Sequence, residues 1–168
     1  MWRRMRTETR RYAAEVRRRR GMKLEDPNVL YAQMFGNFQL HYNGSPLTGE
    51  RLRDTYFTSL MQILLHHIDR GVSRDDLEEV LLGDRDVENR RQALQTIVYK
   101  AKKKLKNMGL PEENYIVLKK GVYYWTPKIP VREDAAVFDR LCRQAADCME
   151  EEEQLTLYLD ACYLYKGE

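Results

Sequence analysis

Residues 89–107 read NRRQALQTIVYKAKKKLKN, and the spacing of their apolar side chains predicts the amphipathic helix around which the fold is built. At about 3.6 residues a turn, these side chains fall on one stripe, which we expect to face a core. The stripe, extended by one residue beyond this stretch, consists of Ala93, Leu94, Ile97, Ala101, Leu105 and Met108.

The same stretch carries seven basic residues and no Asp or Glu. A helix that needed only solubility would mix the two signs, because Glu and Lys one turn apart attract while like charges repel. The basic residues are Arg90, Arg91, Lys100, Lys102, Lys103, Lys104 and Lys106. We therefore expect an anionic partner, although lysines near a helix C-terminus also complement the helix dipole.

Length and composition predict one domain with a short appendage. The chain has 168 residues, of which 43% are hydrophobic, enough to supply a core. No stretch has the roughly 18 apolar residues of a membrane span, and none near the start resembles a signal peptide. We expect a soluble, cytoplasmic protein with no membrane partner. Cys142, Cys148 and Cys162 are odd in number and lack CxxC spacing, which predicts buried, reduced thiols.

Charge is unevenly distributed along the chain. Residues 1–30 carry a net charge of +6, residues 31–132 carry +4, and residues 133–168 carry −7. A basic front and middle with an acidic tail suit a protein that touches nucleic acid with one part and a different partner with the other.

Residues 1–28 form an arginine-rich segment whose role is open. Residues 1–21 predict a helix with Met5, Tyr12 and Val16 on one side, ending at Gly21. The segment has too few apolar residues to form a domain. It fits a DNA-contacting arm, a linker or a solvated helix.

A period-two pattern follows from Leu30 to Tyr42 and predicts strands with one buried side, bent at Gly36-Asn37. Asn43-Gly44 is a tight-turn dipeptide, so a short return strand is expected at residues 45–47.

Three helices are expected next. Residues 50–68 predict the first, and its His66 and His67 lack further ligands at a metal-binding spacing, so we expect no metal. Ser73 and Asp76 resemble a capping box that starts the second helix, which ends at Gly83. The second helix is expected to bury Leu77, Val80 and Leu81. A turn of about four residues then leads through Asp86-Val87 into the basic helix, which is the helix-turn-helix arrangement.

Residues 115–125 predict a β-hairpin with Lys119-Lys120-Gly121 at its tip. A basic helix followed by a hairpin with lysines at its turn indicates a winged helix. We expect Tyr123, Tyr124 and Trp125 to pack against the core rather than to stack on bases.

Residues 133–149 and 151–166 predict two further helices of tetratricopeptide-like size. Such a unit cannot bury its apolar face alone, so it docks on the winged helix, pairs with another chain or continues into further repeats. The expected apolar residues are Ala136, Phe138, Leu141, Ala145, Leu155, Leu157, Tyr158, Ala161, Cys162 and Leu164.

Several of these segments together resemble one bacterial family over residues 31–166. FGNFQLHYNG at 35–44, LLHHIDRGVSRDDLEEVLL at 64–82, RQALQTIVYKAKKKL at 91–105 and KKGVYYW at 119–125 look like the DNA-binding domain of the SARP-type activators (Streptomyces antibiotic regulatory proteins). These activators are a branch of the OmpR-like winged helices. VREDAAVFDRLCRQAA at 131–146 is similar to the start of the bacterial transcriptional activator domain that follows in that family.

The resemblance implies a four-stranded N-terminal sheet, three helices and a C-terminal hairpin, with DNA read at promoter direct repeats by molecules bound in tandem. It places DNA contacts at Gln95, Thr96, Tyr99, Lys100, Lys103, Lys104 and, on the wing, Lys120. The chain departs from the family at Leu82, where Trp is usual, and at Ala101, where Leu is usual. Its activator region is also far shorter than the family's full helical array.

The sequence therefore predicts an α+β protein: a winged helix-turn-helix with an N-terminal antiparallel sheet and a C-terminal β-hairpin wing, plus an appended TPR-like helical hairpin. The expected parts are a basic arm or linker at 1–28, an OmpR-like domain at 29–128 and a minimal activator domain at 131–168.

We expect sequence-specific binding of double-stranded DNA by a transcriptional regulator, with the basic helix in the major groove and the wing on the adjacent backbone or minor groove. Base edges would be read by Arg91, Gln95, Thr96 and Tyr99. Phosphates would be contacted by Lys100, Lys102, Lys103, Lys104, Lys106 and Lys120. RNA polymerase, and self-association through residues 133–166, are further candidate partners.

The alternative is a protein-interaction module that uses the winged helix and the acidic helical pair. An enzyme is not expected, because the sequence has no G-x-x-x-x-G-K-[ST] loop, no G-x-S-x-G elbow and no metal-ligand cluster. No cofactor is expected.

Overall fold

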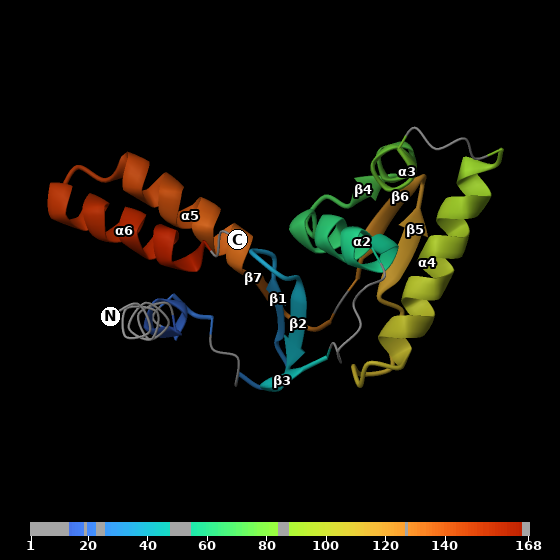
Figure 1. Ribbon diagram of the computed structural model, residues 1–168, viewed down its shortest axis with the longest axis horizontal. Helices are drawn as coiled ribbons and strands as arrows, with labels where there is room; N and C mark the ends of the chain where they lie inside the picture. Colours follow the sequence, from blue (N-terminus) through green and yellow to red (C-terminus); the bar gives the residue numbers. More distant parts are fainter. Residues whose placement is uncertain are drawn as a thin grey trace, which may run out of the picture. The chain divides into compact units, whose positions relative to one another are not determined.

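The computed structural model describes residues 14–18, 20–22, 26–47, 55–83, 88–126 and 128–165. The chain divides into two compact units, of which one comprises residues 1–45 and 131–168 and the other residues 46–130 (Figure 1). Helices and two sheets make a mixed fold, so the predicted α+β class is confirmed.

The unit of residues 46–130 contains three helices and a small sheet among its described residues. The helices are α2 (Thr55–His66), α3 (Arg74–Leu82) and α4 (Arg90–Lys106). The strands are β4 (Val72–Ser73), β5 (Ile116–Lys119) and β6 (Val122–Trp125), which pair antiparallel in the order β4-β6-β5. Helix α2 contacts α3, α4 and β6, so it lies at the centre of this unit.

The β5–β6 hairpin closes through a two-residue turn where the sequence predicts one. Lys120 and Gly121 both have positive φ, at 49° and 81°. This is the conformation that matches the twist of the two strands, and glycine adopts it without a steric penalty. The side chain of Lys120 is exposed.

Helix α3 begins and ends as predicted. The Ser73 hydroxyl oxygen accepts a hydrogen bond from the Asp76 N–H at 3.1 Å, and the Ser73 O–H donates to the Asp76 carboxylate at 2.6 Å. Gly83 ends the helix with φ 55°. Helix α3 ends at Leu82 and α4 begins at Arg90. The predicted opening of the basic helix at Asp86-Val87, and most of the predicted turn before it, lie outside the described residues.

The core of this unit differs from the predicted set on α3 and around α4. Val98 is 6% exposed and buried, whereas Ala93, Ile97 and Met108 are only half-buried. The buried stripe of α4 therefore runs through Leu94, Val98, Ala101 and Leu105. Val80 was expected to be buried but is 65% exposed, and Leu82 is buried instead. The most deeply buried side chains of the unit are Phe57, Leu60, Met61, Leu64, Leu65, Leu77, Leu94, Leu105 and Ile116.

The other unit contains a four-stranded sheet, but one strand has an unexpected origin. Strands β1 (Leu30–Gln33) and β2 (Gln39–Tyr42) pair antiparallel, and the sheet order is β3-β2-β1-β7, where β3 is Ser45–Pro46. Strand β7 (Val131–Glu133) pairs parallel with β1. The expectation of a wholly N-terminal, antiparallel sheet is therefore wrong, because a segment about 100 residues further along the chain supplies its edge.

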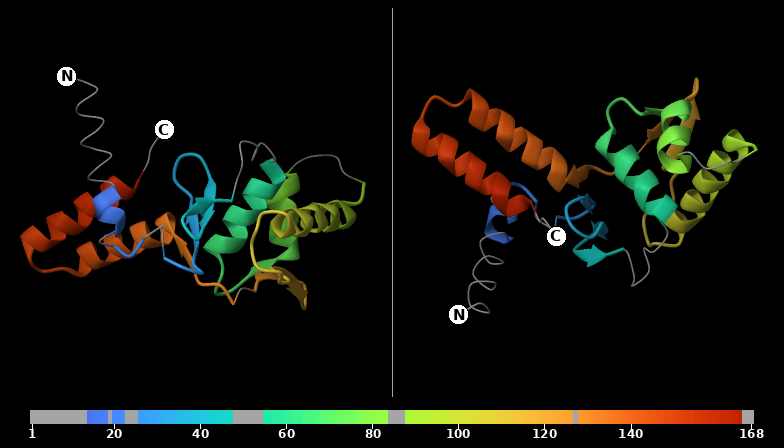
Figure 2. Two further views of the ribbon diagram at one scale, coloured as in Figure 1. Left: turned by 90° about the horizontal axis from the view of Figure 1, so that it is seen from below. Right: turned by 45° about the horizontal axis from the view of Figure 1, so that its top comes forward.

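The two predicted C-terminal helices are present as α5 (Asp134–Asp147) and α6 (Glu151–Leu164), which lie side by side in both views of Figure 2. Their buried apolar residues are Val137, Leu141, Ala145, Leu157, Ala161 and Leu164. Ala136, Leu155 and Cys162, which were expected on the buried stripes, are exposed. Tyr158 is 41% exposed.

The described part of the arginine-rich segment packs within this unit. Residues 14–18 are helical, and Val16 and Met22 belong to the same hydrophobic cluster as the buried residues of α5 and α6. Gly21 ends the helical stretch with φ 83°, as the sequence predicts. Arg20 forms an ion pair with the buried Asp160 of α6 at 2.6 Å. One of the two compact units thus groups residues 1–45 with residues 131–168.

The three cysteines are free thiols, but none is buried. Cys142 and Cys148 are half-buried and Cys162 is exposed. The expectation of buried thiols is therefore wrong, and at Cys162 the reason is that the buried face of α6 passes through Ala161 and Leu164 instead.

Asp134 joins α5 to the β1–β2 connection. It is 1% exposed, and its carboxylate accepts hydrogen bonds from the N–H groups of Met34 at 2.6 Å, Phe35 at 3.4 Å and Ala135 at 3.0 Å. Burial raises the pKa of Asp134 above its usual range, while these three donors and the charge of Arg17 oppose the rise.

Asp134→Ala should lower the free energy of unfolding by about 2–4 kcal/mol, because it leaves buried backbone donors without an acceptor. Chemical denaturation followed by circular dichroism measures this change. Asp139→Ala, at an exposed position of the same helix, is the matched control and should change little. Equal midpoints for the two variants would contradict the role given to Asp134.

Candidate nucleic-acid interface

Helix α4 presents one face to a core and the opposite face to solvent. Leu94, Val98, Ala101 and Leu105 are buried. The exposed residues of the helix and its C-cap cover the other side: Arg91, Gln92, Gln95, Thr96, Tyr99, Lys100, Lys103, Lys106 and Asn107. None of the exposed residues is acidic, so this face offers cations and hydrogen-bonding groups to a partner.

The predicted site residues on α4 divide into two groups. Seven of them are exposed on the outer face: Arg91, Gln95, Thr96, Tyr99, Lys100, Lys103 and Lys106. Lys102 and Lys104 are half-buried at the two borders of the buried stripe. The tenth predicted residue, Lys120, is exposed in the turn of the β5–β6 hairpin.

Lys104 takes part in packing between helices. Its ammonium lies 4.5 Å from the centre of the Phe57 ring on α2. A cation over an aromatic face is attracted by the electron density of the ring. Lys104 therefore helps to hold α4 against α2, in addition to any contact with an external anion.

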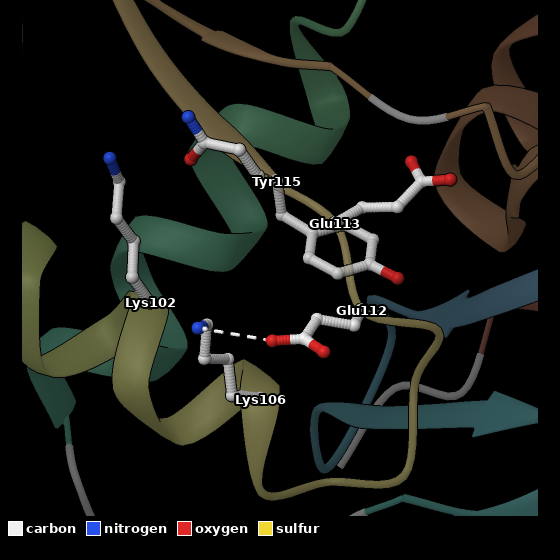
Figure 3. Close-up of a pocket in the computed structure, with 6 residues that line it drawn as sticks. Lys102, Lys106, Glu112, Glu113 and Tyr115 are labelled. Atoms are coloured by element: carbon white, nitrogen blue, oxygen red, sulfur yellow. Dashed lines mark hydrogen bonds and ion pairs between the residues drawn. The ribbon is translucent and has the colours of Figure 1, made fainter.

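The C-terminal end of α4 borders a shallow pocket of about 430 Å³ formed with the segment that precedes β5. Lys102 and Lys106 line one side, and Glu112, Glu113, Asn114 and Tyr115 line the other (Figure 3). The Lys106 ammonium lies 3.5 Å from the Glu112 carboxylate, in an exposed and therefore weak ion pair. Acidic side chains thus offset part of the positive charge at this end, while Lys100 and Lys103 lie outside the pocket lining.

Arg90 was counted in the sequence as one more cation, but it has a structural role. Its guanidinium donates to the Gly83 carbonyl at 2.9 Å and to the Glu78 carbonyl at 3.0 Å. The Gly83 carbonyl lies just after the last turn of α3, where backbone acceptors lack partners within the helix, and the Glu78 carbonyl lies inside the helix. Arg90 thereby fixes the start of α4 against the end of α3.

Asn89 caps the helix start, because its side-chain oxygen accepts the Gln92 N–H at 3.0 Å.

Two basic residues near the hairpin were not selected from the sequence. The Arg74 N–H donates to the Gly121 carbonyl at 2.9 Å, which places the start of α3 beside the hairpin turn. Burial raises the pKa of the Tyr123 hydroxyl on β6, and the charges of Arg74 and Arg91 act to lower it. Arg74 and Arg91 therefore both lie within electrostatic range of the Tyr123 hydroxyl. Lys119 is exposed next to Lys120.

The aromatic residues of the hairpin pack inward, as expected. Tyr123 and Trp125 are 4% and 3% exposed, and the rings of Trp125 and Tyr115 lie 5.1 Å apart. Tyr124 is half-buried. The hairpin therefore presents lysines rather than aromatic rings at its tip.

The described residues contain no group of three or more His, Cys, Asp or Glu side chains placed to hold a metal ion. No helix among them is both long and apolar enough to cross a membrane.

Comparison with known proteins identifies the fold. No protein-family model matches the chain, and no curated protein matches its sequence. A solved structure of EmbR from Mycobacterium tuberculosis, in complex with a low-affinity phosphopeptide, is similar with a TM-score of 0.60 at 16% sequence identity. The match covers 82% of this chain and 36% of the EmbR chain. The chain therefore has a mixed α+β fold similar to the winged-helix fold of EmbR, and it spans about a third of that protein.

Arg90→Ala should lower the free energy of unfolding by about 1–2 kcal/mol, since it removes two charge-assisted hydrogen bonds to backbone carbonyls. Arg91→Ala removes the same charge from the neighbouring, exposed position and should leave stability unchanged within about 0.5 kcal/mol. Thermal denaturation of both variants measures the difference. An equal loss for the two would contradict the separate roles assigned to these arginines.

Proposed function

We propose that the chain is the DNA-binding part of a bacterial transcriptional regulator and binds double-stranded DNA in a sequence-specific way. Helix α4 enters the major groove and the β5–β6 hairpin, as the wing, contacts the adjacent backbone or minor groove. The observation that carries this proposal is the outer face of α4, which is exposed, free of acidic residues and rich in Lys and Arg.

The physical basis is the charge of DNA. A duplex carries one phosphate charge for about every 1.7 Å of its axis, and its major groove accommodates one α-helix. Exposed Lys100 and Lys103 supply phosphate contacts on α4, and Lys119 and Lys120 supply them on the wing. The similarity in fold to EmbR, a SARP-family regulator, supports this assignment.

The N-terminal half of α4 is suited to reading bases. Gln95 and Thr96 carry exposed hydrogen-bonding side chains. Arg91 lies one turn earlier, at the border of the outer face, from which its long side chain can reach either a base edge or a phosphate. The Thr96 hydroxyl already donates to the Gln92 carbonyl at 3.0 Å, which leaves its oxygen as an acceptor for a partner.

Other parts of the proposal follow from this role. A DNA-binding regulator works in the cytoplasm, has no catalytic activity of its own and contacts RNA polymerase or further copies of itself through residues outside α4. Binding to promoter direct repeats in tandem belongs to the same proposal.

A second candidate function is a protein-interaction module, and one observation favours it. Helix α6 buries Leu157, Ala161 and Leu164, yet its other side exposes Leu155, Tyr158, Leu159 and Cys162. A helix that is apolar all round is usually covered by a partner. A partner protein would bind this exposed face of the acidic helical pair, α5 and α6. Such binding is compatible with DNA binding by α4.

Lys103→Ala should weaken binding to all DNA sequences and flatten the dependence of log K on log salt by about one unit, because one phosphate contact is lost. Fluorescence anisotropy with DNA selected from a random pool, at two or more salt concentrations, measures both quantities. Lys128→Ala removes one exposed positive charge outside α4 and the hairpin and is the matched control. Equal salt slopes for Lys103→Ala and the parent would remove Lys103 from the interface.

A further inference from the structure

Charged and neutral side chains occupy different parts of the outer face of α4. Successive residues of an α-helix are turned by about 100°, so the exposed side chains of α4 span an arc of roughly half a turn. Arg91 and Lys102 lie at one border of this arc, and Lys100 and Lys104 lie at the other. The middle of the arc, through residue 99, carries only neutral side chains: Gln92, Gln95, Thr96 and Tyr99.

This order matches the shape of a major groove. When a helix lies in the groove, the middle of its outer arc faces the base edges on the groove floor, and the borders face the two phosphate backbones. Helix α4 has the matching arrangement, with cations at both borders of its outer arc and neutral side chains between them. Beyond Tyr99 the neutral row ends, because Lys103 and Lys106 lie in the middle of the arc. A recognition helix contacts base edges with its N-terminal residues, so these two lysines near the C-terminus are placed for phosphate contacts instead.

Tyr99 is the largest side chain in the neutral row, and it is 68% exposed. Among the described residues of 46–130, the other large apolar side chains that are clearly exposed are Val80 and Leu118, which lie outside α4. An exposed aromatic ring in a row otherwise made of amides and a hydroxyl gives that row one apolar contact surface. Bases in a duplex are stacked, so the ring cannot reach their faces.

We propose that Tyr99 is a specificity-determining residue whose ring contacts the C5-methyl group of a thymine. This inference rests on the proposed DNA binding and adds the identity of one base that the protein recognises. The thymine methyl is the one apolar group that base pairs present in the major groove. A phosphate contact by the phenol hydroxyl fits less well, since Tyr99 lies near the middle of the arc and the borders already carry cations.

The position of the thymine follows from the neighbours of Tyr99. Gln95 and Thr96 lie one turn before it on the same face, and Lys103 lies one turn after it. The thymine therefore lies between base pairs read by the amide and hydroxyl side chains and the part of the site where lysine contacts begin.

The test replaces each thymine of a DNA site, selected from a random pool by the complete chain, with deoxyuridine, which removes only the methyl group. Wild-type protein should lose affinity about fourfold at one thymine, the value expected for one buried methyl group. Tyr99→Ala should bind both DNAs with equal affinity at that position, and Tyr99→Phe should keep the fourfold difference.

The possible results distinguish a failure of the Tyr99 inference from a failure of the proposed DNA binding. If wild-type and Tyr99→Ala proteins show the same fourfold loss, another residue contacts the methyl group and the inference is overturned. The same conclusion follows if the wild-type protein binds DNA through Lys103 but tolerates deoxyuridine at every position. Protein that binds no DNA at low salt would overturn the proposed function as well. Thermal denaturation should show unchanged folding for both variants, because the Tyr99 side chain is mostly exposed.

Discussion

The structure depends on the burial of one side of α4. Leu94 and Leu105 have no solvent exposure, and the helix packs against α2 and α3. Burying a Leu side chain stabilises a fold by roughly 1.5–3 kcal/mol, so the orientation of α4 about its own axis is fixed by its apolar stripe. Because that stripe must face inward, the opposite side of the helix, which carries Lys and Arg and no carboxylate, must face solvent. The charged face is therefore a consequence of the same packing that forms the core.

Two further contacts hold this face in a defined position. Arg90 joins the start of α4 to the end of α3, and Lys104 lies over the Phe57 ring of α2. Basic residues of one helix thus have different tasks: some connect it to its neighbours, and others remain available to an external anion. The sum of charges in the sequence does not separate these tasks, whereas the direction of each side chain does.

Local patterns in the sequence predicted most of the elements. The 3.6-residue period located α4, the Ser73 capping box located the start of α3, and Lys120-Gly121 located the hairpin turn. Errors arose where the choice depends on distant residues. The parallel pairing of β7 with β1 joins segments about 100 residues apart, which no local pattern can indicate. Val80 and Val98 each lie next to another apolar residue, so a small rotation of the helix decides which of the two is buried.

For the candidate site, the sequence indicated which helix carries it but not how its residues are arranged. Eight of the ten predicted residues are exposed. No local pattern indicated that Lys104 packs on Phe57 or that Lys106 pairs with Glu112. These contacts join α4 to residues that are distant in sequence or follow after a loop.

DNA binding through the exposed face of α4 is tested most directly by amine-reactive labelling of the lysines with and without selected DNA, read by mass spectrometry. If α4 and the wing contact DNA, bound DNA should protect Lys100, Lys103 and Lys120 from the reagent and leave Lys128 reactive. Bound DNA that leaves the α4 lysines as reactive as in the free protein would contradict it.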